Sequence, residues 1–168
     1  PPIEGVGKAG VYTRRTPADA IGIRDYVKEH TVRNAVVVGG GFIGLEAAEN
    51  LQRLGLSVAV LDVAGQILPG VLDSEMANYV QRYLTRRGIR IVTGAKAEQI
   101  QGLDRVTGIK TSAGLFPAEL VILSAGIRPN TAFLQGSGIE MIRGAIVTGP
   151  QMETNLPDVY AAGDCALV

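Results

Sequence analysis

The feature that most constrains the fold is an apolar strand that runs straight into a glycine-rich turn. Ala35–Val38 is a short, continuous apolar run, as a strand buried on both faces requires. The turn spans residues 39–44, and apolar residues then recur at helical spacing until Gly55. A second apolar run, Val58–Leu61, ends at Asp62. A strand, a glycine turn, a helix, a second strand and an acidic residue thus follow one another. This order predicts one βαβ unit of an α/β fold with a parallel sheet.

The glycines of the turn have the spacing Gly39-x-Gly41-x-x-Gly44, and each has an expected role. Gly39 permits the tight turn off the strand, Gly41 has no Cβ and lets the backbone approach a pyrophosphate, and Gly44 lets the helix pack closely on the strand. The start of the helix offers unpaired N–H groups and a positive dipole end to phosphates. The pattern predicts a dinucleotide-binding site, with three glycines in an ordinary turn as the alternative.

Asp62 favours NAD over NADP as the dinucleotide. At the end of the second strand, a carboxylate can bind both ribose hydroxyls of an adenosine. It would repel an adenosine 2′-phosphate, and residues 63–66 contain no Arg or Lys to receive one. We therefore expect NADH to bind more tightly than NADPH.

The rest of the chain extends this unit to a larger sheet with an antiparallel insertion. The pattern predicts helices that start at Thr16–Pro17 and at Asp73 or Ser74, strands at 89–92 and 120–123, a three-stranded meander within 95–120, a short helical piece near 131–134, and apolar strands at 145–147 and 159–162. The expected fold is α/β, a parallel sheet flanked by helices with an inserted three-stranded antiparallel meander.

Composition argues against several classes of function. Sixteen basic residues balance sixteen acidic ones, so no net charge attracts nucleic acid or an anionic membrane, and no apolar run approaches the roughly 18 residues of a membrane span. The one His and one Cys argue against a transition-metal site and exclude an internal disulfide. The absence of a secretory signal and of disulfides favours a cytoplasmic location. The start Pro1-Pro2, without an initiator Met, predicts a piece of a longer protein.

Four stretches resemble, in order, the pyridine nucleotide-disulfide oxidoreductase family. They are Val36–Glu46, Ile67–Pro69 with Asp73–Met76, Ala125–Thr131, and Thr154–Pro157 leading to Tyr160–Asp164, and they cover nearly the whole chain. The third stretch is most similar to the branch of NADH oxidases, NADH peroxidases and coenzyme A-disulfide reductases. The resemblance implies a Rossmann-like NAD domain inserted in a flavoprotein.

The resemblance also implies roles for residues inside and outside the turn. Phe42 matches an aromatic position near the nicotinamide, and Glu46 matches the glutamate near the nicotinamide carboxamide. Gly126 matches a loop that touches the cofactor, and Asp164 matches the aspartate that hydrogen-bonds the ribitol of FAD. The candidate cofactor-binding residues are Gly39, Gly41, Phe42, Ile43, Gly44, Glu46, Asp62, Gly126 and Asp164, the last for FAD in the full enzyme.

The resemblance implies further parts outside this sequence. The family places its FAD fingerprint and redox cysteines before position 1 and a dimerisation domain after position 168, and Cys165 does not match the redox cysteine. We therefore expect residues 1–15 to be a linker from an absent FAD domain, 16–144 to be the NAD(H)-binding domain, and 145–168 to return toward the FAD domain. We expect no catalytic residue and no metal ligand in this chain, which alone should be inactive, and a homodimer for the full enzyme.

These observations predict the NADH-binding domain of a FAD-dependent oxidoreductase, which holds the nicotinamide for hydride transfer to flavin. A standalone nucleotide-sensing domain is the alternative, but it would have no use for the Tyr160–Asp164 stretch. A third reading, FAD at the glycine turn, predicts a Glu and a basic pair after the second strand, where this chain has Asp62-Val63-Ala64. From spacing alone, Glu46 can equally serve the helix dipole, and Arg128-Pro129-Asn130 can be a plain turn.

Overall fold

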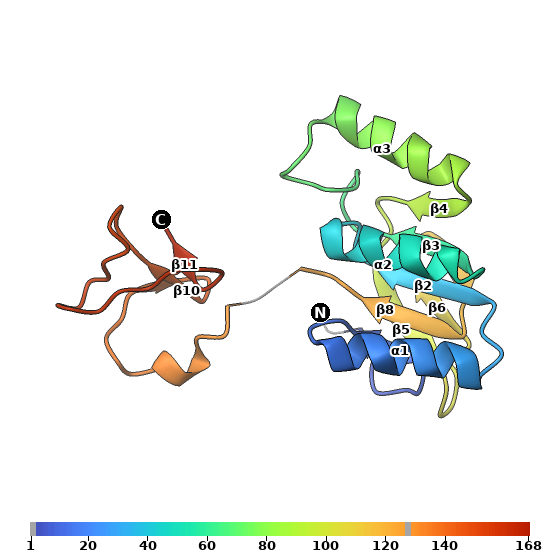
Figure 1. Ribbon diagram of the computed structural model, residues 1–168, viewed down its shortest axis with the longest axis horizontal. Helices are drawn as coiled ribbons and strands as arrows, with labels where there is room; N and C mark the ends of the chain where they lie inside the picture. The colour runs from blue at the N-terminus through green and yellow to red at the C-terminus, as the bar shows by residue number, and fades with distance from the viewer. Residues whose placement is uncertain (1–2, 127–128) are drawn as a thin grey trace. The chain divides into compact units, whose positions relative to one another are not determined.

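The structure, a computed structural model, describes residues 3–126 and 129–168 (Figure 1). The chain divides into two compact units, Pro1–Ala125 and Gly126–Val168. The elements of the first unit are β1 (Val11–Thr13), α1 (Pro17–Glu29), β2 (Asn34–Val38), α2 (Phe42–Arg53), β3 (Ser57–Leu61), α3 (Ser74–Arg86), β4 (Ile89–Val92), β5 (Ala97–Gln101), β6 (Gly108–Thr111), β7 (Gly114–Pro117) and β8 (Leu120–Leu123).

A five-stranded sheet organises the first unit. Its strand order is β1-β8-β2-β3-β4, and every neighbouring pair is parallel. β2 lies at the centre, and its residues Ala35–Val38 are buried, as their uninterrupted apolar run predicts.

The two faces of the sheet are covered by different layers. Because side chains alternate in direction along a strand, Val37 of β2 packs in the core beneath the helices, and Val36 packs in a second core with Ile100 and Ile109 of the meander. The helices α1, α2 and α3 lie together on the first face (Figure 1). The antiparallel strands β5, β6 and β7 cover the second face. This arrangement confirms the predicted α/β fold class with its inserted three-stranded meander.

Two of the helices start with a side-chain cap. The Thr16 hydroxyl accepts a hydrogen bond from the Asp19 N–H, and the Asp19 carboxylate accepts one from the Thr16 N–H, a reciprocal capping box. Asp73, rather than Ser74, caps α3 by accepting from the Met76 N–H at 2.8 Å.

The N-terminal residues pack into the first unit, where the sequence predicted a linker. β1 pairs in parallel with β8 at the edge of the sheet. Upstream of it, Glu4 and Ala9 form isolated bridges with Gln99 and Arg105 of the meander. An extended segment supplies the N–H and C=O partners that the edges of β8 and of the meander would otherwise lack. The glycines and prolines of this segment gave no signal of that pairing.

The second unit contains a 3₁₀ helix, η1 (Ala132–Leu134), and a sheet of three short strands in the order β11-β10-β9. The strands are β9 (Met141–Ile142), β10 (Ala145–Val147) and β11 (Ala166–Leu167). η1 and β10 lie where the sequence predicted them. The strand predicted at 159–162 is wrong, because Tyr160 makes only an isolated bridge with Glu153 and the strand that pairs with β10 is β11. Both segments are apolar, so composition alone could not choose between them.

The chain divides at a different point from the expected boundary at 144/145. Residues 126–144 belong with the C-terminal segment in the second unit. Across the expected boundary, the Glu140 N–H donates to Asn155 Oδ1 at 2.9 Å, and Asn155 Nδ2 donates to the Gly138 carbonyl oxygen at 2.8 Å. β9 also pairs with β10 across the expected boundary. These bonds join the two sides of position 144 into one unit.

Glu119 ties the amino ends of β2 and β8 together, opposite the glycine turn. Its carboxylate accepts the N–H groups of Asn34 at 2.8 Å and Arg33 at 3.1 Å. Partial burial raises the pKa of Glu119, but these hydrogen bonds outweigh burial and hold the pKa below its usual value of 4.5. A carboxyl with a lowered pKa stabilises the fold above its unfolded pKa, and that contribution is lost as the pH falls through the folded pKa.

We therefore expect Glu119→Gln to lower the free energy of unfolding at pH 7 by about 1 kcal/mol, a small value because the carboxylate is partly exposed. The difference from wild type should shrink as the pH falls below 4.5. Urea unfolding at pH 7 and at lower pH measures both effects. A difference that stays constant with pH would show that the ionised carboxylate is not the cause.

No helix within the described residues 3–126 and 129–168 is both long and apolar enough to cross a membrane.

Candidate dinucleotide-binding site

The glycine turn lies at the carboxyl end of β2, where the strand order of the sheet changes direction. From β2 the chain continues through β3 to β4 on one side, whereas β8 and β1 lie on the other side. Parallel strands bring their carboxyl ends to one edge, so Asp62 after β3, Ser124 after β8 and Arg14 after β1 share this edge with the turn. In an open α/β sheet, this is where a crevice for ligands forms.

Gly39 and Gly44 are required by the packing of the protein itself. Gly39 has a φ of +116°, which favours glycine, and its N–H donates to the Leu61 carbonyl oxygen at 2.8 Å. A Cβ at Gly39 would collide with the carbonyl oxygen of Ser124. A Cβ at Gly44 would collide with the carbonyl oxygen of Gly39 and stand 3.4 Å from the Val37 side chain. The predicted close approach of α2 to β2 is therefore present.

Gly41 is different, because none of the described residues stands where its Cβ would be. Its φ of −79° is open to any residue, and a Cβ would meet no heavy atom within 4 Å. It is the N-cap of α2, and no side chain caps this helix, in contrast to α1 and α3. The next two residues, Phe42 and Ile43, are 65% and 44% exposed. The start of α2 thus presents backbone N–H groups to a space that suits a phosphate.

Asp62 holds the glycine turn in shape. Its Oδ2 accepts the Gly40 N–H at 2.6 Å, and its Oδ1 accepts the Ala64 N–H at 2.8 Å. On the other side, the Leu68 N–H donates to the Gly40 carbonyl oxygen at 2.9 Å. Gly40 is therefore fixed at both its N–H and its C=O, a role that the sequence did not indicate. Each Asp62 oxygen keeps acceptor capacity for a ribose hydroxyl.

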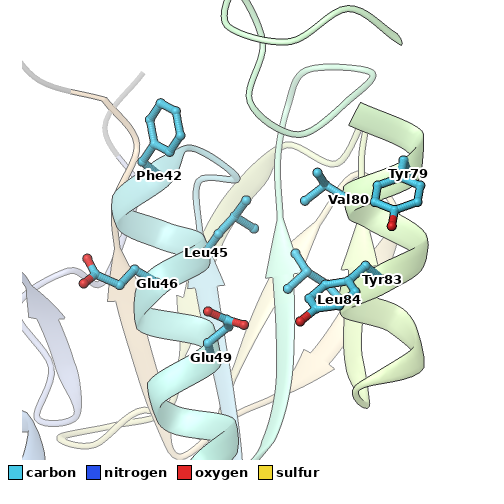
Figure 2. A pocket seen from close by; sticks show the side chains of 8 residues that line it. All are labelled: Phe42, Leu45, Glu46, Glu49, Tyr79, Val80, Tyr83 and Leu84. Carbon is cyan, nitrogen blue, oxygen red and sulfur yellow. The ribbon is translucent and has the colours of Figure 1, made fainter. Parts of the chain in front are cut away.

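Glu46 lies beyond the first turn of α2 and forms an ion pair with Arg14. The distance from Arg14 Nη2 to Glu46 Oε2 is 2.7 Å. Glu46 leaves α2 on the side away from α3 (Figure 2). A helix dipole acts mainly within the first turn, so this contact is a more specific role for Glu46 than the dipole. The sequence missed Arg14 because it assigned the preceding strand to a linker.

Two buried side-chain atoms without a hydrogen-bond partner lie at the same edge. Among the described residues these are Arg14 Nε and Ser124 Oγ. Thr13 of β1 lies opposite Leu123 of β8, so the residues that follow them, Arg14 and Ser124, leave neighbouring strands side by side. The edge beside the turn therefore carries polar groups that the described protein does not satisfy.

A hollow of the first unit lies between α2 and α3. It measures about 430 Å³, and Phe42, Leu45, Glu46, Glu49, Tyr79, Val80, Tyr83 and Leu84 line it (Figure 2). Two of its lining residues, Phe42 and Glu46, are also candidate cofactor-binding residues. The candidate dinucleotide site at the strand ends is identified by the backbone geometry of the turn and not by a hollow.

The remaining predicted residues belong to the second unit. Gly126 has a φ of +81°, and Asp164 is exposed in the turn that precedes β11. Ile127 and Arg128 of the Ala125–Thr131 stretch lie outside the described residues. Cys165 is a half-buried free thiol, and the described residues contain no cluster of three or more His, Cys, Asp or Glu placed to hold a metal ion.

Several known proteins with a similar sequence and fold are named as NADH oxidases or NAD-dependent reductases. A family described as pyridine nucleotide-disulphide oxidoreductase matches residues 1–168. An NADH oxidase of Methanocaldococcus jannaschii is 38% identical over 100% of this chain. The structure of a NAD-dependent persulfide reductase from A. fulgidus matches 99% of the chain with a TM-score of 0.91 and 36% identity. A water-forming NADH oxidase from Lactobacillus brevis, solved with NADH bound, matches 99% of the chain with a TM-score of 0.88 and 29% identity.

The chain spans only part of each of these proteins. It covers 38% of the Methanocaldococcus jannaschii oxidase, 31% of the persulfide reductase and 36% of the Lactobacillus brevis oxidase. The family match nevertheless extends over the whole chain and agrees with the glycine turn, the parallel sheet and the inserted meander. The chain therefore belongs to the pyridine nucleotide-disulphide oxidoreductase family.

Proposed function

We propose that this chain binds NADH at the glycine turn and positions the nicotinamide for hydride transfer to a flavin held by other parts of the same polypeptide. The observation that carries the proposal is the contrast within the turn. Gly39 and Gly44 are demanded by internal packing, whereas Gly41 faces open space at an uncapped helix start. A ligand that approaches the backbone closely there explains why the chain has no side chain at position 41.

The residues at this edge fit three different parts of a dinucleotide. The N–H groups at the start of α2 would bind the pyrophosphate, Asp62 would accept hydrogen bonds from the adenosine ribose, and Glu46 would accept one from the nicotinamide carboxamide. Phe42 and Ile43, exposed beside the turn, would border the nicotinamide. When bound, NADH supplies the hydride, and the chain contributes orientation.

The relatives' length supports further domains in the whole protein. Flavin-binding and dimerisation segments of the same polypeptide are proposed on that basis and on the family resemblance. In that enzyme, Gly126 would touch the nicotinamide cofactor, and Asp164, exposed before β11, would hydrogen-bond the flavin ribitol.

Preference for NADH over NADPH rests on Asp62 and its surroundings. The carboxylate stands beside the turn, and the following residues 63–66 contain no cation. A 2′-phosphate on the adenosine ribose would face this carboxylate at short range and lose its own hydration without an opposing charge.

Asp62→Ala should weaken NADH binding by about 1–3 kcal/mol, or about 5- to 150-fold, since it removes acceptors for the ribose and for the Gly40 N–H. NADPH binding should change less, so the preference for NADH should narrow. Calorimetric titration of the chain with both nucleotides measures this.

Asp104→Ala is the matched control, because Asp104 is an exposed aspartate in the meander, away from the strand ends. It should leave both affinities unchanged. An equal loss of NADH and NADPH affinity in Asp62→Ala would contradict a role of this carboxylate in selecting the nucleotide. Failure of wild type to bind NADH at all would refute the proposed function.

A further inference from the structure

Arg14 is the residue at the sheet edge that neither the glycine motif nor the family resemblance assigns. It directly follows β1, beside Ser124 at the end of β8. Its side chain enters a hollow of about 170 Å³ between α1 and α2, which Ile23 and Ala47 help to line. The guanidinium is thus anchored between the sheet and two helices, with 29% of its side chain exposed.

From this anchored position Arg14 reaches Glu46, which is 63% exposed. The hydrogen bond joins Arg14 Nη2 to Glu46 Oε2 at 2.7 Å and leaves Oε1 outside the pair. An exposed glutamate without a partner samples several rotamers, and fixing them costs free energy on binding. A glutamate already held by an anchored guanidinium avoids part of that cost.

We propose that Arg14 is a positioning residue, which orients Glu46 so that its second oxygen accepts an N–H from the amide of a bound nicotinamide. The inference rests on the proposed function. It also names a specificity, because the pair should favour ligands whose pyridine ring carries an amide N–H over ligands without that donor. The buried Ser124 Oγ and Arg14 Nε, both without partners in the described residues, place more polar groups beside the same edge.

The ion pair itself should contribute little to folding. A partly exposed pair stabilises a protein by about 0–1 kcal/mol, so its removal should leave the fold intact. Loss of Arg14 should therefore be visible in binding of the amide end and not in binding of the adenosine end. This separation distinguishes a positioning role from a structural one.

The test measures the affinity of the chain for three ligands by calorimetry. NADH carries the amide, reduced 3-acetylpyridine adenine dinucleotide replaces the amide by an acetyl group without an N–H, and ADP-ribose has no pyridine ring. Arg14→Gln should weaken NADH binding by about five- to tenfold, the size expected when one ordinary hydrogen bond is lost. Binding of the acetylpyridine analogue and of ADP-ribose should change by less than about twofold. Arg14→Lys should restore part of the loss.

A double-variant cycle measures whether the effect of Arg14 on NADH affinity depends on Glu46. A purely structural role of Arg14 would not depend on Glu46. In a Glu46→Ala background, Arg14→Gln should cause no further loss of NADH affinity, because the residue through which Arg14 acts is gone. Arg24→Gln is the matched control. Arg24 lines the same hollow and pairs with Asp25 at 2.8 Å, but it does not contact Glu46. It should leave all three affinities unchanged.

The outcomes separate the two proposals. If wild type binds ADP-ribose and NADH but Arg14→Gln binds NADH normally, the positioning role is wrong and the proposed function stands. If Arg14→Gln weakens ADP-ribose as much as NADH, Arg14 maintains the whole site and the positioning role is again wrong. If wild type binds none of the three ligands, the proposed function fails and this inference fails with it.

Discussion

Gly41→Val is expected to abolish NADH binding and to leave the fold intact. A side chain at this position meets no heavy atom of the described protein within 4 Å, and its φ of −79° is open to valine. The same side chain would stand where the pyrophosphate has to approach the N–H groups at the start of α2. The loss should exceed about 3 kcal/mol, or about 100-fold in affinity.

Calorimetric titration with NADH, together with thermal unfolding followed by circular dichroism, measures the two effects separately. Gly7→Val is the matched control, because Gly7 likewise has open space at its Cβ and lies away from the strand ends. It should bind NADH as wild type does. Normal NADH binding by Gly41→Val would place the phosphate site elsewhere and remove the observation on which the proposed function rests.

Gly44→Ala should have the opposite effect, a loss of stability. The added Cβ would collide with the Gly39 carbonyl oxygen, a backbone atom that cannot rotate away, so α2 must move off β2. We expect a loss of about 3 kcal/mol in the free energy of unfolding, the upper part of the range for overpacking. This corresponds to a fall of about 6–12 °C in Tm for a chain of this size.

Helix propensity alone predicts the opposite effect on stability. Alanine is a better helix former than glycine by about 1 kcal/mol, so local preference alone would stabilise Gly44→Ala. Gly41→Ala is the control, since it adds the same methyl group to open space and should lower the Tm much less than Gly44→Ala does. A Gly44→Ala protein as stable as wild type would show that α2 can shift without cost and that the close packing of helix on strand is not required.

The sequence by itself determined the central βαβ unit and most of the elements around it. Ala35–Val38 and Val58–Leu61 are apolar without interruption, and such runs form strands buried on both faces, as β2 and β3 are. Thr16 and Asp73 mark helix starts through bonds within one turn, which local sequence encodes. The glycine spacing likewise located the turn, because the backbone conformation of a few neighbouring residues determines where glycine is needed.

Only the tertiary structure decided the features that depend on partners distant in the chain. Val11–Thr13 becomes a sheet strand because β8 offers an open edge, and the residues of the segment carry no sign of that partner. The apolar stretch at 159–162 does not become a strand, because β10 pairs with Ala166–Leu167 instead.

The same distinction holds within the candidate site. The motif treats its three glycines alike, but their neighbours show that Gly39 and Gly44 serve packing and that Gly41 leaves space. The sequence predicted that Asp62 binds the adenosine ribose. The structure shows that its carboxylate also accepts a hydrogen bond from the Gly40 N–H. Arg14 meets Glu46 only because β1 and α2 converge at the carboxyl edge of the sheet. Contacts between residues far apart in sequence arise from the packing of whole elements, and local spacing carries no record of them.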